Sequence, residues 1–263
     1  MYEHYTALGV EQRGGELRIT LQNPPLNGMT PQMHDELPLI FRQVARDPQA
    51  RVVVLTGSGD RAFSAGGDIR GMYEGLDRHE GWVSNMPGSR DIILSILECD
   101  KPVIARINGH AMGLGASIAL ACDITVMLDT ARIADTHVKV GLVAGDGGSL
   151  IWPHLIGLQR AKRYLLTGDA LTGAQAAEIG LVTEAASAAD LDRVVDAWAE
   201  RLGNGATRAI SLTKRALNSA IRQQGQIFMD LHLGLETWTH LSQDHREAAT
   251  AFLEKREPKF TGE

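Results

Sequence analysis

The chain has 263 residues, of which 44% are hydrophobic and 22% are charged, as is usual for a globular protein. A formal net charge of −6, with scattered basic residues, excludes the basic footprint of a nucleic-acid-binding protein. The longest run of small apolar residues, 111–122, is too short for a membrane span, and the first residues do not resemble a signal peptide. We therefore expect a cytoplasmic protein with no membrane partner, in which Cys99 and Cys122 are free, buried thiols.

The first half of the chain alternates predicted strands with predicted helices. Alternating or continuous apolar runs predict strands over 17–21, 52–55, 103–107 and 123–127. Apolar residues at helical spacing predict helices over 31–44, 89–98 and 116–122. The first of these helices has Thr30 as its expected cap and Pro31 in its first turn. Strands that alternate with helices imply an α/β fold.

After about residue 145 the pattern becomes helical. The predicted helices cover 150–155, 161–166, 173–179, 189–202, 208–223 and 227–255. In the last of them, apolar residues form a broad stripe that includes Phe228, Leu231, Leu235 and Trp238. Such a layer usually covers a site or a subunit interface.

Two glycine-rich segments each follow a predicted strand. Residues 63–69 read Phe-Ser-Ala-Gly-Gly-Asp-Ile, and residues 107–117 read Ile-Asn-Gly-His-Ala-Met-Gly-Leu-Gly-Ala-Ser. Small residues at such turns let backbone N–H groups approach a ligand closely. Two turns that aim N–H groups at one oxygen would form an oxyanion hole, which suits chemistry through an enolate or a tetrahedral alkoxide.

Several ordered blocks resemble the crotonase (enoyl-CoA hydratase/isomerase) superfamily. These blocks are the two glycine-rich segments together with residues 141–148, 164–168, 176–182 and 252–260. The resemblance implies a ββα spiral core over 1–200 and a C-terminal helical region over 201–263 that forms trimers or a lid. It also implies homotrimers or hexamers and an acyl-CoA thioester substrate, so that CoA is part of the substrate and no cofactor is needed.

The resemblance also implies roles for individual residues. The N–H groups of Gly67 and Leu114 would form the oxyanion hole, with Leu114 standing where many relatives have a glycine. The substrate- and CoA-binding residues would be Ala65, Gly66, Asp68, Ile69, Gly113, Phe252 and Lys255. Asp68 alternatively caps a helix.

The chain departs from the family at the catalytic acids. Hydratases of this family have two glutamates, and the matching positions here are Ser117 and His137. Ser117 is no general base on its own, whereas an imidazole titrates near neutral pH. We therefore expect His137 to pair with Asp146, whose carboxylate would fix the imidazole tautomer. Asp146 also matches the catalytic aspartate of some family members, including dienoyl-CoA isomerases.

Each of these residues also has a structural interpretation. Ser117 could pack within a helix with its hydroxyl bonded back to the same helix, and Asp146 could cap the helix that begins near Gly147. His34 sits on the first predicted helix, where a surface or capping role is as plausible as a ligand role, and His110 and His154 are expected to be structural. No spacing of His, Cys, Asp and Glu suggests a metal site.

Three functions remain open from the sequence. The first is an acyl-CoA enzyme of the hydratase/isomerase type that lacks both hydratase glutamates. The second is a CoA-independent hydrolase that cleaves a carbon–carbon bond of a β-diketone with His137 and Asp146. A resemblance to that branch of the family lies in residues 33–37, His137, 145–147 and 152–154. The third is a non-catalytic acyl-CoA-binding protein.

Overall fold

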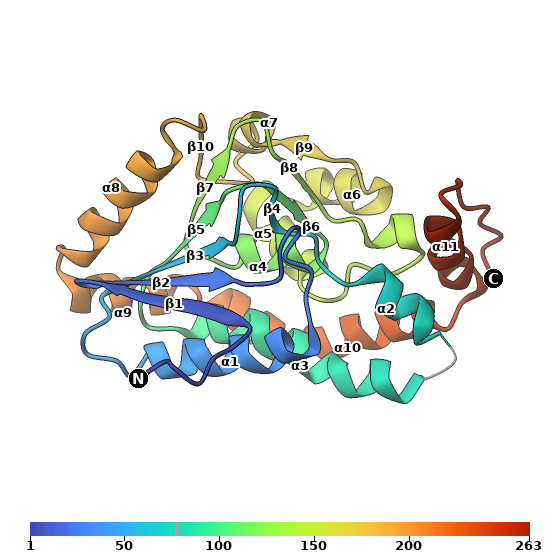
Figure 1. Ribbon diagram of the computed structural model, residues 1–263, viewed down its shortest axis with the longest axis horizontal. Coiled ribbons are helices and arrows are strands. Elements are labelled where there is room, and N and C mark those ends of the chain that lie inside the picture. The colour runs from blue at the N-terminus through green and yellow to red at the C-terminus, as the bar shows by residue number, and fades with distance from the viewer. Residues whose placement is uncertain (77–78) are drawn as a thin grey trace.

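The computed structural model describes residues 1–76 and 79–263, and it contains two β-sheets enclosed by helices (Figure 1). The larger sheet has, in spatial order, β1 Leu8–Arg13, β2 Glu16–Leu21, β3 Val52–Gly57, β5 Val103–Ile107, β7 Ile124–Leu128 and β10 Glu184–Ala186. The smaller sheet has β4 Ala62–Ser64, β6 His110–Met112, β8 Arg132–Ala134 and β9 Leu171–Thr172. Among the strand pairs of the described residues, only β1–β2 and β8–β9 are antiparallel.

The two sheets are built from a repeated ββα unit. Strands β3, β5 and β7 are neighbours in the larger sheet, and the strand that follows each of them, β4, β6 or β8, lies in the smaller sheet. A helix comes next in each unit. This repetition is the predicted spiral α/β core, and it brings the segments that follow β4, β6 and β8 to one region of the molecule.

Helices cover the larger sheet on both faces. The N-terminal and central helices are α1 Pro31–Val44, α2 Ile69–Glu74, α3 His79–Glu98, α4 Leu114–Leu120, α5 Gly148–Ile156, α6 Leu158–Thr167 and α7 Gly173–Glu178. The later ones are α8 Leu191–Gly203, α9 Thr207–Leu217, α10 Ser219–His240 and α11 Gln243–Glu254. In Figure 1, α1, α3 and α10 run below the sheet, α8 lies at the upper left, and α11 lies with the C-terminus at the far right.

Local sequence signals account for the elements of the core. Thr30 caps α1, because its hydroxyl accepts a hydrogen bond from the Met33 N–H at 3.2 Å. The apolar stripe of that helix is completely buried, as predicted. All six residues of β3 are buried, since α1 and α3 cover one face while Leu191 and Val195 of α8 pack on the other. Cys99 and Cys122 are buried free thiols, also as predicted.

The structure corrects several predicted boundaries. Strand β1 has no counterpart among the predicted elements, and α3 begins ten residues before the predicted start at 89. The single helix predicted over 227–255 is wrong, because α10 ends at His240 and Ser242 caps a separate α11. Helices α9, α10 and α11 all lie within 204–263. The predicted division of the chain at residue 200 stays a prediction.

The apolar stripe of α10 faces outward rather than into the chain. Phe228, Leu231, Leu235 and Trp238 are all exposed, and Trp238 retains 75% of its accessible surface. The buried side of α10 carries Gly225, Met229, Leu233, Glu236 and His240 instead. Within the described ranges, no helix has the length and apolar character needed to cross a membrane.

Candidate active site

The site is centred on the segment between β8 and α5, which we call the 135–147 loop. It contains Asp135, His137 and Asp146, all of which are buried. His137 opens a single 3-10 turn over His137–Val140, and Gly141 ends that turn in the left-handed conformation at φ 68°. The turn reverses the chain, so that Asp146 returns to the side of His137 as the sequence predicted.

His137 contacts a carboxylate through each ring nitrogen. Nδ1 lies 2.7 Å from Asp135 Oδ1, and Nε2 lies 3.1 Å from Asp146 Oδ2. Burial alone would lower the pKa of His137, but the negative charges and hydrogen bonds of Asp146 and Asp135 raise it well above its usual value. A raised pKa favours the imidazolium form, which can donate one hydrogen bond to each carboxylate.

Ser117 joins this group from α4. Its hydroxyl donates a hydrogen bond to Asp146 Oδ1 at 3.2 Å, so each Asp146 oxygen has a different donor. The expectation that this hydroxyl bonds back into its own helix is wrong. The expectation that Asp146 caps the next helix is also wrong, because Gly147 is the N-cap of α5 and the cap makes no side-chain hydrogen bond.

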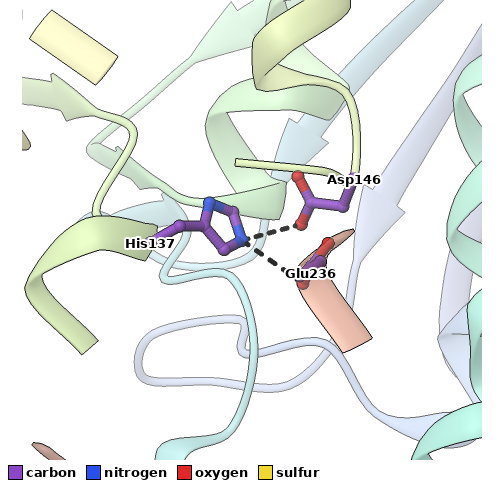
Figure 2. A group of neighbouring side chains, drawn as sticks. All are labelled: His137, Asp146 and Glu236. Carbon is purple, nitrogen blue, oxygen red and sulfur yellow. Dashed lines mark ion pairs between the residues drawn. The ribbon is translucent and has the colours of Figure 1, made fainter. Parts of the chain in front are cut away.

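Glu236 is a further member of the site that the sequence analysis did not identify. It projects from α10 toward His137 (Figure 2), and its Oε1 lies 4.0 Å from His137 Nε2. Only 3% of Glu236 is exposed. Burial, followed by the charge of Asp146, raises the pKa of Glu236 to about 8 despite the opposing effect of His137. The one sequence signal is its spacing from Met229 and Leu233, which places a glutamate on the buried stripe of α10.

His137, Asp146 and Glu236 lie close enough together to bind one divalent cation. His137 Nε2 and one oxygen each of Asp146 and Glu236 lie within 4.8 Å of one another. The hydrogen on Nε2 that reaches Asp146 competes with metal ligation, because a histidine binds metal only through an unprotonated nitrogen. The prediction that the site needs no metal remains a prediction.

The two glycine-rich turns come together beside this group. A methyl group placed on Gly66, where φ is 78°, would lie 3.3 Å from the Leu114 nitrogen and 2.5 Å from the Met112 carbonyl oxygen. Only glycine fits such a close approach. Leu114 opens α4, and among the described residues neither its N–H nor that of Gly67 donates to a backbone carbonyl. Two N–H donors are thus available in adjoining turns.

Gly113 connects the turns to the charged group. A methyl group on Gly113 would lie 3.6 Å from His137 Cε1 and 3.9 Å from Nε2, so the imidazole lies beside the residue that precedes Leu114. The terminal methyl of Met72, on α2, occupies the space next to Gly67. The glycine turns and the 135–147 loop therefore border one region.

The other predicted binding residues divide into two groups. Ala65, whose N–H donates to the Leu26 carbonyl at 2.9 Å, adjoins the first glycine turn, and Asp68 and Ile69 lead into α2. Phe252 and Lys255, by contrast, lie at the far end of α11, where 56% of Phe252 is exposed. The roles of all five in binding substrate or CoA stay predictions.

Of the other candidate histidines, His34 lies near the site, whereas His110 and His154 do not. His34 is half-buried on α1, close enough to Asp146 that this carboxylate opposes the lowering of the His34 pKa by burial. His110 and His154 lie outside the site, where His110 Nδ1 accepts from the Arg132 N–H and His154 Nε2 bonds Gln224 Oε1. Both histidines therefore have structural hydrogen bonds, as expected.

Known proteins resemble the chain over almost all of its length. A model of the enoyl-CoA hydratase/isomerase family matches residues 11–263. The 1,2-epoxyphenylacetyl-CoA isomerase of Escherichia coli is 32% identical, over 94% of this chain and 95% of the isomerase. The short-chain-enoyl-CoA hydratase of Clostridium acetobutylicum is 30% identical, over 94% of each.

A solved structure agrees in fold and sequence. The enoyl-CoA hydratase/isomerase from Mycobacterium paratuberculosis superimposes with a TM-score of 0.88 at 36% identity, covering 93% of this chain and 98% of that one. The ββα core with its helical C-terminal region is thus the crotonase fold that the sequence predicted. On the family match and these relatives, the chain belongs to the enoyl-CoA hydratase/isomerase (crotonase) family.

Proposed function

We propose that the protein transfers protons on an acyl-CoA thioester through an enolate, with Asp146 as the base and Glu236 as the acid. The observation that carries this proposal is the pair of carboxyl groups beside one doubly hydrogen-bonded imidazole. Asp146 accepts hydrogen bonds from His137 and Ser117, one on each carboxylate oxygen. Glu236 has a pKa raised to about 8 and keeps its proton at neutral pH. Two carboxyl groups in such different environments supply a base and an acid at the same pH.

The proposed reaction begins at the thioester carbonyl. Its oxygen accepts hydrogen bonds from the N–H groups of Gly67 and Leu114, which stabilise the negative charge that develops there. Asp146 removes a proton from C2, and the electron pair of that bond moves toward the carbonyl oxygen. With a 3-enoyl substrate, Glu236 delivers its proton to C4 as the double bond shifts to C2–C3. The support for a CoA thioester is that the similar isomerase of Escherichia coli and the similar hydratase of Clostridium acetobutylicum are both named for a CoA substrate.

Isomerisation fits this site better than hydration. By the resemblance to the family, Ser117 and His137 match the positions of the two hydratase glutamates, so the carboxylates that position water in a hydratase are expected to be missing from those places. We expect hydration of crotonyl-CoA to fall well below the ~10⁶–10⁸ M⁻¹s⁻¹ of efficient enzymes. A value within that range would contradict the assignment.

A second candidate rests on the 3.1 Å contact between His137 and Asp146. In a CoA-independent hydrolase this pair would activate a water molecule for attack on one carbonyl of a β-diketone. The carbon–carbon bond would then break to give a carboxylic acid and a ketone. Because both nitrogens of His137 face carboxylates, Asp146 would have to be the base in this reaction also.

Two assays separate these candidates. Calorimetry with CoA and butyryl-CoA tests binding, and NMR of pentane-2,4-dione with the enzyme tests for release of acetate. The proposal predicts binding of butyryl-CoA and no acetate. Acetate release without binding of any CoA species at millimolar concentration would replace it with the hydrolase. Binding without deuterium exchange at C2 of butyryl-CoA in D₂O would favour the non-catalytic alternative.

We also propose that the exposed face of α10 makes contacts between copies of the chain in a trimer or hexamer. Its support is the row of exposed apolar side chains Ile227, Phe228, Leu231, Leu235 and Trp238. Apolar patches of this kind are typical of protein interfaces. Light scattering of wild type and Trp238→Glu tests this, and a monomeric wild-type protein would contradict it.

A further inference from the structure

Part of the 135–147 loop is held in place by the two C-terminal helices. The carbonyl of Val140 accepts a hydrogen bond from His245 Nδ1 at 2.7 Å, and the Val143 N–H donates to Thr239 Oγ1 at 3.1 Å. His245 belongs to α11 and Thr239 to α10, the helix that carries Glu236. These bonds therefore tie the turn that begins at His137 to the helix on the other side of the site.

Gly141 brings the backbone of α11 directly against this turn. A methyl group there would lie 2.8 Å from the His245 nitrogen and 2.9 Å from the Asp244 carbonyl carbon. Side chains larger than hydrogen are excluded both by this contact and by the positive φ. The start of α11 is itself fixed, because the Ser242 hydroxyl accepts a hydrogen bond from the His245 N–H at 3.1 Å.

The ring of His245 packs against a stacked pair of aromatic rings, His240 and Trp82. His245 is completely buried and lies 4.9 Å from the ring of His240, which stacks on Trp82 at 3.9 Å with an interplanar angle of 5°. Trp82, on α3, donates from its indole N–H to Thr237 Oγ1 at 3.2 Å. The acceptor at Nδ1 is a carbonyl oxygen, so Nδ1 must be the protonated nitrogen.

We infer that His245 is a positioning residue that holds His137 in place through the Val140 carbonyl. Val140 ends the single 3-10 turn that His137 begins, so a displacement of Val140 is transmitted to the imidazole over one turn of backbone. His137 is in turn the donor to Asp146 and the neighbour of Glu236. The inference rests on the proposed function, because it assigns His245 an effect on the reaction that Asp146 carries out.

Three variants test this role. His245→Phe keeps a ring of similar size and loses the donor, whereas His245→Asn places an amide N–H close to the position of Nδ1–H. Ser242→Ala is the matched control, because it removes the cap of α11 and leaves the bond to Val140 in place. The measurements are deuterium exchange at C2 of butyryl-CoA in D₂O, its KM, the melting temperature and the NMR signals of the His137 ring.

The inference predicts that His245→Phe slows the exchange roughly 10–100-fold with little change in KM, as misplacement of a reacting group does. His245→Asn should recover most of the rate, and Ser242→Ala should lower the melting temperature with a near wild-type rate. Equal rates for His245→Phe and Ser242→Ala, or no recovery in His245→Asn, would overturn the inference.

The proposed function can fail separately. If Asp146→Asn retained full activity, the proposed chemistry would be wrong, and the His137 ring signals would then decide the role of His245. Signals that shift in His245→Phe and return in His245→Asn would support positioning of His137. Signals unchanged in both variants would overturn it.

Discussion

Glu236 Oε1 lies 4.0 Å from His137 Nε2, the same nitrogen that contacts Asp146 Oδ2 at 3.1 Å. This relationship brings α10 into a site that is otherwise built from the 135–147 loop and the glycine turns. It also places the proposed acid, Glu236, beside the proposed base, Asp146.

The first prediction concerns the pH dependence of stability. The pKa of Glu236 rises to about 8 in the folded protein from the ordinary value of 4.5, chiefly through burial. A proton bound more tightly in the folded state contributes stability that is present at low pH and is lost as pH rises through about 8. The melting temperature of the wild type should therefore fall between about pH 5 and about pH 9.

Glu236→Gln is the variant that checks this, because its amide imitates the neutral acid. Its melting temperature should fall less over the same range. Part of the fall in melting temperature should remain in Glu236→Gln, because the raised pKa of His137 also makes stability decrease as pH rises. Parallel curves for the two proteins would show that Glu236 is ionised in the folded wild type.

The second prediction concerns the glycine turns. Gly66→Ala should abolish activity, because the added methyl would lie 3.3 Å from the Leu114 nitrogen, within the proposed oxyanion hole. Gly59→Ala is the matched control, since φ is 72° there but nothing lies within 4 Å of the methyl. Both variants should lose roughly 1–2 kcal/mol of stability from the left-handed backbone. Gly66→Ala should lose more than Gly59→Ala, because its methyl would also lie 2.5 Å from the Met112 carbonyl oxygen. Folded Gly66→Ala with the activity of Gly59→Ala would remove Gly66 from the site.

Ser117 gives a third prediction. Ser117→Ala should slow the reaction roughly 2- to 13-fold, because Asp146 loses one hydrogen bond worth roughly 0.5–1.5 kcal/mol and keeps its contact with His137. The rate of deuterium exchange into butyryl-CoA measures this. If Ser117→Ala proved as slow as Asp146→Asn, Ser117 would have a direct part in the chemistry.

Removal of metal ions gives a fourth prediction. Because the Nε2 hydrogen of His137 is directed at Asp146, the site should work without a cation. Dialysis against EDTA should leave the exchange rate unchanged, and added Zn²⁺ or Mn²⁺ should not raise it. A rate that falls on chelation and returns with one of these ions would identify His137, Asp146 and Glu236 as metal ligands.

Local signals explain which features could be predicted from the sequence. The Thr30 cap and the buried strand β3 depend on neighbouring residues, and both were predicted. The meeting of His137 with Asp146 followed from their places on either side of one short loop. Glu236 could not be predicted in this way, because its role depends on how α10 packs against a distant loop. The apolar stripe that the sequence shows on α10 lies on the exposed face of the helix, whereas Glu236 lies on the buried face.

The most direct measurement is deuterium exchange at C2 of butyryl-CoA in D₂O, compared between wild type, Asp146→Asn and Glu236→Gln. We predict exchange by the wild type and a loss of roughly 10²–10⁴-fold in Asp146→Asn, as expected for removal of a general base. Glu236→Gln should retain more of this exchange while losing isomerisation of a 3-enoyl-CoA, because Glu236 acts at C4. No exchange by the wild type, or wild-type exchange by Asp146→Asn, would contradict an enolate formed by Asp146.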